Sequence, residues 1–156
     1  MPLSHAVVLG ALLAAPHLTW HPYDEALSLA ARAQKHVLVN VVIAGCPWCR
    51  RMDSTTYRDP RVIEELDQHF VLARVDAGSD RKVTYQSRRM SERQLAREVY
   101  EAFQYPTLVF LAPDAKVVMS ETGFVAPVEF RSIAGYVGDG SYERKLKSLD
   151  QAPRSP

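Results

Sequence analysis

The two cysteines of this chain lie three positions apart, in the motif Cys46-Pro47-Trp48-Cys49. Two thiols at this spacing can form and break one disulfide bond between them, which is the chemistry of thiol–disulfide exchange. In such an exchange a thiolate attacks a disulfide sulfur, a mixed disulfide forms, and a second thiol resolves it. The motif therefore predicts a dithiol centre that exchanges disulfides with another molecule.

The position of the motif indicates a different role for each cysteine. An apolar run rich in β-branched residues, 36–43, precedes Gly45, and Pro47 is typical of the first turn of a helix, where its missing N–H costs nothing. Cys46 then lies at the helix N-terminus, where free backbone N–H groups and the helix dipole stabilise a thiolate. We expect Cys46 to attack the substrate disulfide and the more covered Cys49 to resolve the intermediate.

A structural metal site is the alternative for two cysteines, and the sequence argues against it. Structural zinc takes four ligands, whereas the chain has a single Cys-x-x-Cys motif and no histidine directly after it that would indicate haem attachment. The five histidines are scattered without the spacing of ligands: His5, His17, His21, His36 and His69. We therefore expect no metal and no other cofactor.

Length and composition limit the remaining function classes. The chain has 156 residues, which suits one domain with a substantial core. With 19 basic and 18 acidic residues the net charge is +1, so the composition gives no argument for binding nucleic acid. Two cysteines in one short motif cannot connect distant parts of the fold, which excludes a framework of structural disulfides.

The N-terminal residues have part of the pattern of an export signal. Residues 6–15 are an uncharged apolar run whose length suits a secretory signal and is too short to span a bilayer. No lysine or arginine precedes this run, and Pro16 follows it directly, so the pattern is incomplete. We expect residues 1–18 to be a signal or an N-terminal extension, 19–149 the folded domain, and 150–156 a frayed tail.

The hydrophobic pattern predicts helices and strands that alternate around the motif. In chain order it predicts a helix over 24–34 capped by Asp24, strand 36–43, a helix from 47 to about 55, a helix starting at 60, strand 70–76, helix 91–103, strands 107–111 and 117–119, helix 127–137 and a short helix 142–149. The first two strands should pair in parallel through a right-handed crossover. The predicted fold is α/β, a mixed central sheet with helices on both faces.

Three local signals complete this assignment. Ser91 and Gln94 form a capping box that opens the helix after the second long strand. Segment 78–89 before it is polar and basic without clear periodicity, which predicts a solvated inserted loop; selection of an acidic partner by this loop is the alternative. In the last core helix we expect Val128 and Phe130 to face inward.

Pro106 is a further candidate site residue, because it directly precedes a strand downstream of the cysteines. A proline in this place can adopt a cis peptide bond and present the preceding backbone to an extended substrate, although only about 5–6% of X–Pro bonds in folded proteins are cis. The alternative is an ordinary proline at the start of a strand. Trp48 and Tyr105 are candidates for contacting substrate, and for each of them packing within the fold is the alternative.

Together these motifs resemble the thioredoxin superfamily. The resemblance rests on the Cys-Pro-Trp-Cys motif at 46–49, on the apolar strand before it and on segment 105–110, in which Tyr-Pro-Thr leads into a strand. It covers about residues 20–137. More narrowly, the chain is similar to exported bacterial thioredoxin-like proteins of the SoxW type. That similarity rests on the residues after the motif, among them 59–62, and on the insertion after Asp76.

The resemblance implies a thioredoxin fold in which Cys46 is the nucleophile, Cys49 the resolving thiol and Pro106 a cis-proline beside them. The chain departs from thioredoxins proper in two places. Pro-Trp stands between the cysteines where thioredoxins usually have Gly-Pro, and Asn40 stands where they carry a buried carboxylate. An asparagine cannot accept a proton from Cys49, so the direction of electron flow stays open at this point.

We expect the protein to be a reductase of protein or small-molecule disulfides. We expect it to work in the periplasm or elsewhere outside the cytoplasm, recharged by a reducing partner such as a membrane thiol carrier, and to be a monomer. A disulfide oxidant or isomerase for exported proteins would use the same residues, and a thioredoxin-like binding module without turnover is a third hypothesis. A cytoplasmic location is the alternative to export, and no nucleic-acid partner is expected.

Overall fold

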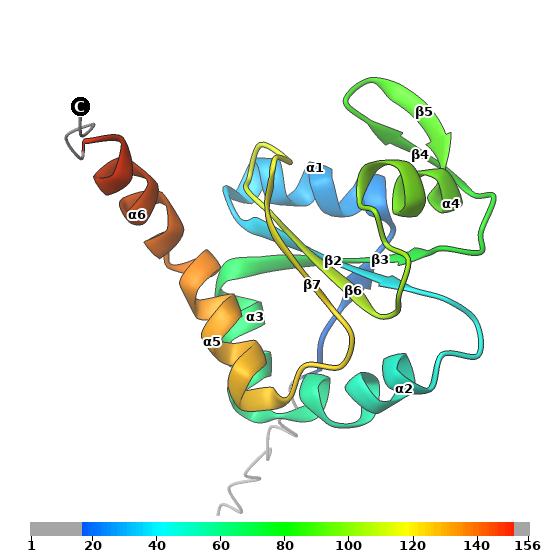
Figure 1. Cartoon of the computed structure of the whole chain (residues 1–156), viewed down its shortest axis with the longest axis horizontal. Helices are drawn as coiled ribbons and strands as arrows, with labels where there is room; N and C mark the ends of the chain where they lie inside the picture. The colour runs from blue at the N-terminus through cyan, green and yellow to red at the C-terminus, as the bar shows by residue number, and fades with distance from the viewer. Residues whose placement is uncertain (1–16, 152–156) are drawn as a thin grey trace, which may run out of the picture.

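A five-stranded mixed sheet is the centre of the fold within residues 17–151, which are the residues that the structure describes. The structure is a computed structural model. The apolar run 6–15 and the tail residues 152–156 lie outside the described residues. The strand order is β1-β3-β2-β6-β7, with helices on both faces of the sheet (Figure 1). The predicted α/β class is therefore confirmed.

The elements follow the predicted order, with differences at some of their ends. The strands are β1 (Trp20–His21), β2 (His36–Val42), β3 (Phe70–Asp76), β4 (Lys82–Tyr85), β5 (Arg88–Ser91), β6 (Thr107–Leu111) and β7 (Val117–Thr122). The helices are α1 (Tyr23–Ala33), α2 (Pro47–Ser54), the 3-10 turn η1 (Thr56–Arg58), α3 (Pro60–His69), α4 (Glu92–Gln94), the π-helical turn η2 (Leu95–Val99), α5 (Pro127–Gly138) and α6 (Ser141–Asp150). No helix among residues 17–151 has the length and apolar character needed to cross a membrane.

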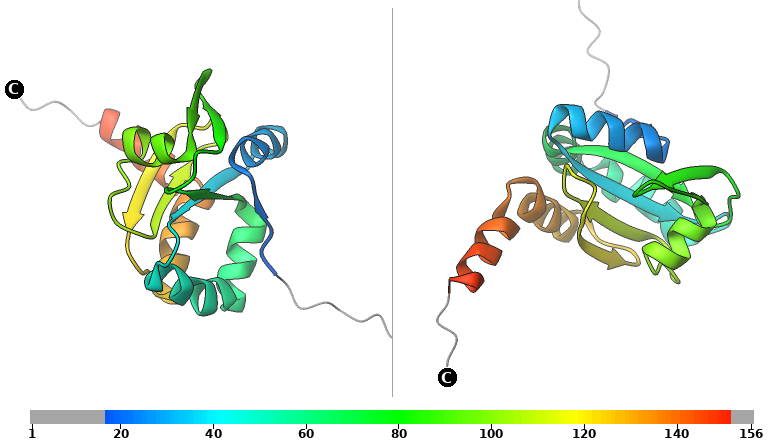
Figure 2. Two further views of the ribbon diagram at one scale, coloured as in Figure 1. Left: turned by 90° about the vertical axis from the view of Figure 1, so that its right-hand side faces the viewer. Right: turned by 90° about the horizontal axis from the view of Figure 1, so that it is seen from above.

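Strand β2 lies between β3 and β6 and is buried on both faces. It pairs in parallel with β3, as expected, and antiparallel with β6. Val39 and its alternate neighbours pack under α1 and η2 on one face, whereas Leu38 packs against α2, α3 and α5 on the other. Figure 2 shows these two helical layers from the side. Each fully buried Val or Leu contributes about 1.5–3 kcal/mol, so the strand that leads to the cysteines is firmly held.

Segment 78–89 contains a β-hairpin and not the expected loop. Strands β4 and β5 pair antiparallel, and the cross-strand partners Val83 and Met90 are both buried against the core beside α1. The turn residues Gln86 and Ser87 have φ values of 45° and 67°. Such left-handed turns usually contain Gly or Asn, so the sequence lacks the ordinary hairpin signal.

The helix expected over 91–103 is shorter than the sequence indicates. The capping box of Ser91 and Gln94 is present, but α4 passes directly into the π-helical turn η2, which ends at Val99. Tyr100, directly after η2, is buried in the core, where its hydroxyl lies 2.7 Å from the Tyr23 hydroxyl. Burial raises the pKa of Tyr23 to about 12, so this hydrogen bond between neutral phenols persists across the physiological pH range.

Two further expectations were wrong. Asp24 does not cap α1, because the helix already begins at Tyr23; its carboxylate instead accepts the N–H of Thr84 in β4 at 2.8 Å. Val128 is 71% exposed, because the buried residues of α5 are Phe130, Ala134 and Val137.

The short helix after α5 was expected and is present as α6, which extends away from the sheet (Figure 2).

Close packing of α5 on α3 generates a testable prediction about stability. A Cβ at Gly138 would lie 2.7 Å from the Cβ of His69, so Gly138→Ala should destabilise the protein by about 1–3 kcal/mol. Gly135→Ala in the same helix is the matched control, because its Cβ would lie 3.7 Å or more from Glu65. We expect that control to be neutral or to stabilise by up to about 1 kcal/mol through helix propensity.

The free energy of unfolding of the oxidised protein, measured by urea titration, checks both substitutions. Equal effects of Gly138→Ala and Gly135→Ala would contradict the close contact between these helices.

Candidate active site

The cysteine motif lies where β2 ends and α2 begins, at one edge of the sheet. Gly45 makes the turn between them with a φ of +78°, in the left-handed region that favours glycine. Cys46 is the N-cap residue of α2, its N–H donates to the Ile43 carbonyl at 3.3 Å, and Pro47 is the first helical residue. The expected helix N-terminus at the first cysteine is confirmed.

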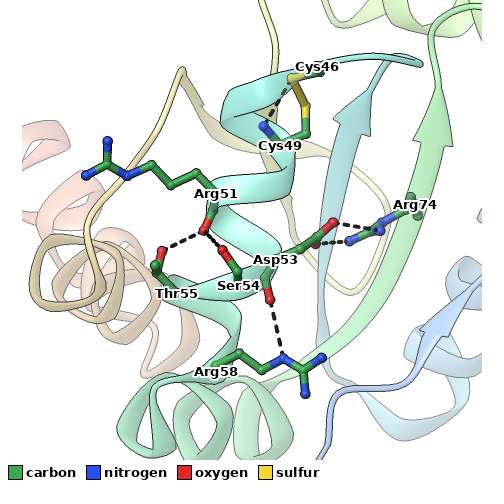
Figure 3. A network of polar contacts seen from close by, with 8 residues as sticks. All are labelled: Cys46, Cys49, Arg51, Asp53, Ser54, Thr55, Arg58 and Arg74. Atoms are coloured by element: carbon green, nitrogen blue, oxygen red, sulfur yellow. Dashed lines mark hydrogen bonds and ion pairs between the residues drawn. A yellow bond between two sulfur atoms is a disulfide. The ribbon is translucent and has the colours of Figure 1, made fainter.

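Cys46 and Cys49 are joined by a disulfide bond, so the structure shows the oxidised form of the centre (Figure 3). Cys49 is only 7% exposed, whereas Cys46 is half-buried. A partner molecule therefore has access to the sulfur of Cys46 before that of Cys49. This difference supports the roles expected for the two residues, which stay predictions until exchange is measured.

The electrostatic environment of Cys46 favours a negative charge on its sulfur. The backbone N–H of Cys49 donates a hydrogen bond to the Cys46 Sγ at 3.1 Å. The first turn of α2 contains no acidic residue, and Arg50 and Arg51 in that helix are exposed cations. In the reduced protein the same N–H group and the helix dipole would stabilise a Cys46 thiolate.

Trp48 is half-exposed and also packs against Phe124, so its side chain has a free surface and a contact within the fold. Its side chain is 50% exposed, and its ring lies 6.0 Å from that of Phe124, centroid to centroid. The guanidinium of Arg51 lies over both rings, 5.5 Å from the centroid of Trp48 and 4.7 Å from that of Phe124. Phe124 was not singled out from the sequence, because it follows β7 in a segment without a recognisable pattern.

The peptide bond between Tyr105 and Pro106 is cis in the structure. Pro106 is buried directly before β6, which pairs with β2, and its carbonyl accepts the N–H of Gly123 at 2.7 Å. Tyr105 is partly buried against the core beside α1, so packing accounts for part of its side chain. Binding of an extended substrate by these two residues stays a prediction.

A polar cluster lies beneath α2, on the sheet face that the helix covers. The guanidinium of Arg74 donates two hydrogen bonds to the Asp53 carboxylate at 2.6 and 3.4 Å (Figure 3). Asn40 is the register partner of Arg74 and is 1% exposed. Within residues 17–151, three buried side-chain nitrogen or oxygen atoms have no hydrogen-bond partner: the Asn40 Oδ1, the Arg74 Nε and the hydroxyl of Tyr57.

The cluster borders a pocket of about 420 Å³ whose lining includes Asp53, Tyr57 and Arg74. Burial raises the pKa of Tyr57, so its hydroxyl stays protonated. Asn40 is buried in this cluster, and the carboxylate that bonds to Arg74 belongs to Asp53 in α2, four residues after Cys49. Among residues 17–151, no group of three or more histidine, cysteine or acidic side chains is arranged to hold a metal ion.

Comparisons with known proteins agree with this geometry. The family model of a thioredoxin-like domain matches residues 23–138. A thioredoxin from Thermus thermophilus is 31% identical, with a TM-score of 0.59 over 80% of this chain and 95% of that one. A thioredoxin-fold protein from Helicobacter pylori is 22% identical, with a TM-score of 0.62 over 74% and 82% of the two chains.

The C-terminal domain of Neisseria meningitidis DsbD in its reduced form is 21% identical, with a TM-score of 0.54 over 70% of this chain and 89% of that one. A search of curated proteins gave no match. The family match and the similarity to these solved structures confirm the thioredoxin fold that the sequence predicted.

The position of Cys46 at the helix N-terminus generates a prediction about its reactivity. In a Cys49→Ser variant, whose single thiol is Cys46, the rate of alkylation by iodoacetamide should reach half its maximum below about pH 7.5, because the helix N-terminus lowers the thiol pKa from about 8.5. A Cys46→Ser variant, which retains the covered Cys49, should react more slowly across the same pH range. A midpoint at or above pH 8.5 for Cys46 would contradict this account.

Proposed function

The chain belongs to the thioredoxin-like domain family, and we propose that it works as a reductase of protein or small-molecule disulfides. Its general activity is that of a thiol–disulfide oxidoreductase. One observation carries the proposal: the disulfide joins a half-buried Cys46 at a helix N-terminus to a buried Cys49 one turn further on. The 31% identity to a thioredoxin supports the reducing direction.

The reaction begins from the reduced dithiol. The Cys46 thiolate attacks one sulfur of the substrate disulfide; that S–S bond breaks, and the other substrate sulfur leaves as a thiolate that takes a proton from water. Cys49 then loses its proton and attacks the Cys46 Sγ, which forms the intramolecular disulfide and releases the second substrate thiol. Two electrons pass from the protein to the substrate, and a dithiol donor must return them.

The side chains around Cys46 have proposed roles in holding the substrate. Pro106, at the start of β6, would place the backbone before it beside an extended segment of substrate. Trp48, half-exposed between the cysteines, would contact that segment, and Tyr105 would border the same surface. The catalytic bond changes themselves need only the two cysteines.

A place outside the cytoplasm and a membrane thiol carrier as electron donor are further parts of the proposal. They are supported by the incomplete signal pattern at residues 6–15 and by the similarity of the sequence to exported thioredoxin-like proteins of the SoxW type. The carrier would supply the dithiol that regenerates Cys46 and Cys49 after each turnover.

A disulfide oxidant or isomerase is the second candidate function, because two features of the site bear on the direction of electron flow. Asn40 is buried beneath α2 without a carboxylate of its own, and Pro-Trp separates the cysteines. Both positions affect the relative stability of the dithiol and the disulfide, and therefore the direction of electron flow.

The reduction potential of the Cys46–Cys49 couple separates these functions. We predict a value near or below about −250 mV, as for thioredoxin-like reductants. The couple is equilibrated in dithiothreitol or glutathione buffers and followed by tryptophan fluorescence, since Trp48 adjoins the disulfide. A value of about −120 to −180 mV would make the protein an oxidant or isomerase. Failure of the cysteines to exchange at all, with client binding that survives Cys46→Ser, would favour a binding module.

A further inference from the structure

Residues 78–93, called here the basic hairpin, leave the sheet at the same edge as the cysteine motif. Because β2 and β3 are parallel, their carboxyl ends lie together; β2 continues to Cys46 and β3 continues into the basic hairpin. The N–H of Ala77 donates to the Val42 carbonyl at 2.8 Å where the two segments separate. Figure 1 shows α2 on one side of this edge and the β4–β5 pair on the other.

The basic hairpin is anchored to the rest of the domain. The N–H of Thr84 donates to the Asp24 carboxylate at 2.8 Å, which connects β4 to α1. The N–H of Glu92 donates to the carbonyl of Arg81 at 2.9 Å, and their side chains form an ion pair in which the glutamate is 1% exposed. Val83 adds an apolar contact with the core. The backbone of the hairpin is therefore held in place, which lowers the entropy cost of ordering it when a partner binds.

The basic hairpin carries more positive charge than it pairs. It contains five basic and two acidic side chains, a net charge of +3, compared with +1 for the whole chain. Both acidic side chains are paired, Glu92 with Arg81 and Asp80 with Arg93. The other three cations are exposed and make no ion pair with any of residues 17–151: Lys82, Arg88 and Arg89.

Segment 101–106 follows the basic hairpin and η2 along the chain and leads to the cis-proline before β6. It runs from the end of η2 to the start of β6, on the side of the sheet edge where α2 begins (Figures 1 and 2). Phe103 in this segment is 67% exposed, and Trp48 in the motif is 50% exposed. Exposed aromatic side chains are typical of the anchors of protein interfaces, and Trp48 also has the guanidinium of Arg51 5.5 Å from its ring centroid.

We propose that this edge is a docking surface for a protein that carries acidic residues beside its disulfide. The inference rests on the proposed function, because the docked disulfide is the one that Cys46 attacks. Complementary charges across an interface raise the association rate and select among partners. Three unpaired cations are few for a nucleic-acid interface, in which many phosphates are neutralised, so an acidic protein surface is the better fit.

Two synthetic peptides test the proposal, each with one intramolecular disulfide, flanked by four aspartates in one and by four asparagines in the other. Oxidation of the reduced full-length protein is followed by stopped-flow tryptophan fluorescence. At about 10 mM salt we expect the aspartate peptide to react roughly 5- to 30-fold faster than the asparagine peptide. At about 1 M salt most of this preference should disappear, because the Debye length falls from about 30 Å to about 3 Å.

A pair of double variants identifies the surface responsible. Arg88→Gln with Arg89→Gln should remove most of the preference for the aspartate peptide. The matched control is Lys145→Gln with Lys147→Gln, which also removes two exposed positive charges, but on α6, and should keep the preference. The ratio of the two peptide rates is compared, so a general change in reactivity does not affect the result.

The outcomes separate this proposal from the function on which it rests. A full preference in the Arg88 and Arg89 variant, or no preference in the unmodified protein, overturns the docking surface and leaves the reductase intact. Reduction of neither peptide by the unmodified protein overturns the proposed function itself. Binding to phosphatidylserine vesicles that is lost in this variant, with equal rates for both peptides, would identify the surface as a membrane contact and also overturn the proposal.

Discussion

The hydrogen bond from the Cys49 N–H to the Cys46 sulfur is the interaction on which the account of this protein depends. It places one sulfur at the positive end of α2, where a thiolate is stabilised, and leaves the second sulfur buried one turn away. The arrangement needs α2 to begin at Cys46, and three features ensure this. Gly45 turns the chain, Pro47 fits the first helical position, and β2 is held on both faces by the core.

The active centre could be predicted from the sequence because its geometry is local. The strand, the glycine turn, the N-cap cysteine and the proline follow one another within a dozen residues, and each has its own backbone preference. The pair of Asp53 and Arg74 could not be predicted in this way, since 21 positions separate the two residues and only the docking of α2 on β3 brings them together. Phe124 comes beside Trp48 for the same kind of reason.

The errors of sequence interpretation have a common physical cause. The β4–β5 pair forms although its turn, Gln86 and Ser87, lacks glycine, because burial of Val83 and Met90 supplies the free energy that a favourable turn would otherwise contribute. Asp24 similarly binds the hairpin rather than capping its own helix. In each case a tertiary contact outweighs the local preference, and both contacts hold the β4–β5 pair against the domain.

The polar cluster of Asn40, Asp53, Tyr57 and Arg74 interrupts the otherwise apolar core beneath α2. Buried polar groups are usually paired, yet Asn40, Tyr57 and Arg74 each have an unpartnered atom within the described residues. Such exceptions are typical of functional sites, and this one lies directly under the helix that carries both cysteines.

Trapping of the mixed disulfide tests the central claim most directly. The Cys49→Ser variant is reduced, incubated with a disulfide-containing protein such as insulin, and analysed by intact-mass spectrometry without reductant. The account predicts a stable adduct on Cys46, because the intermediate forms and no second thiol resolves it. Cys46→Ser should give little or no adduct under the same conditions. An adduct that forms equally on Cys49, or no adduct in either variant, would contradict the account.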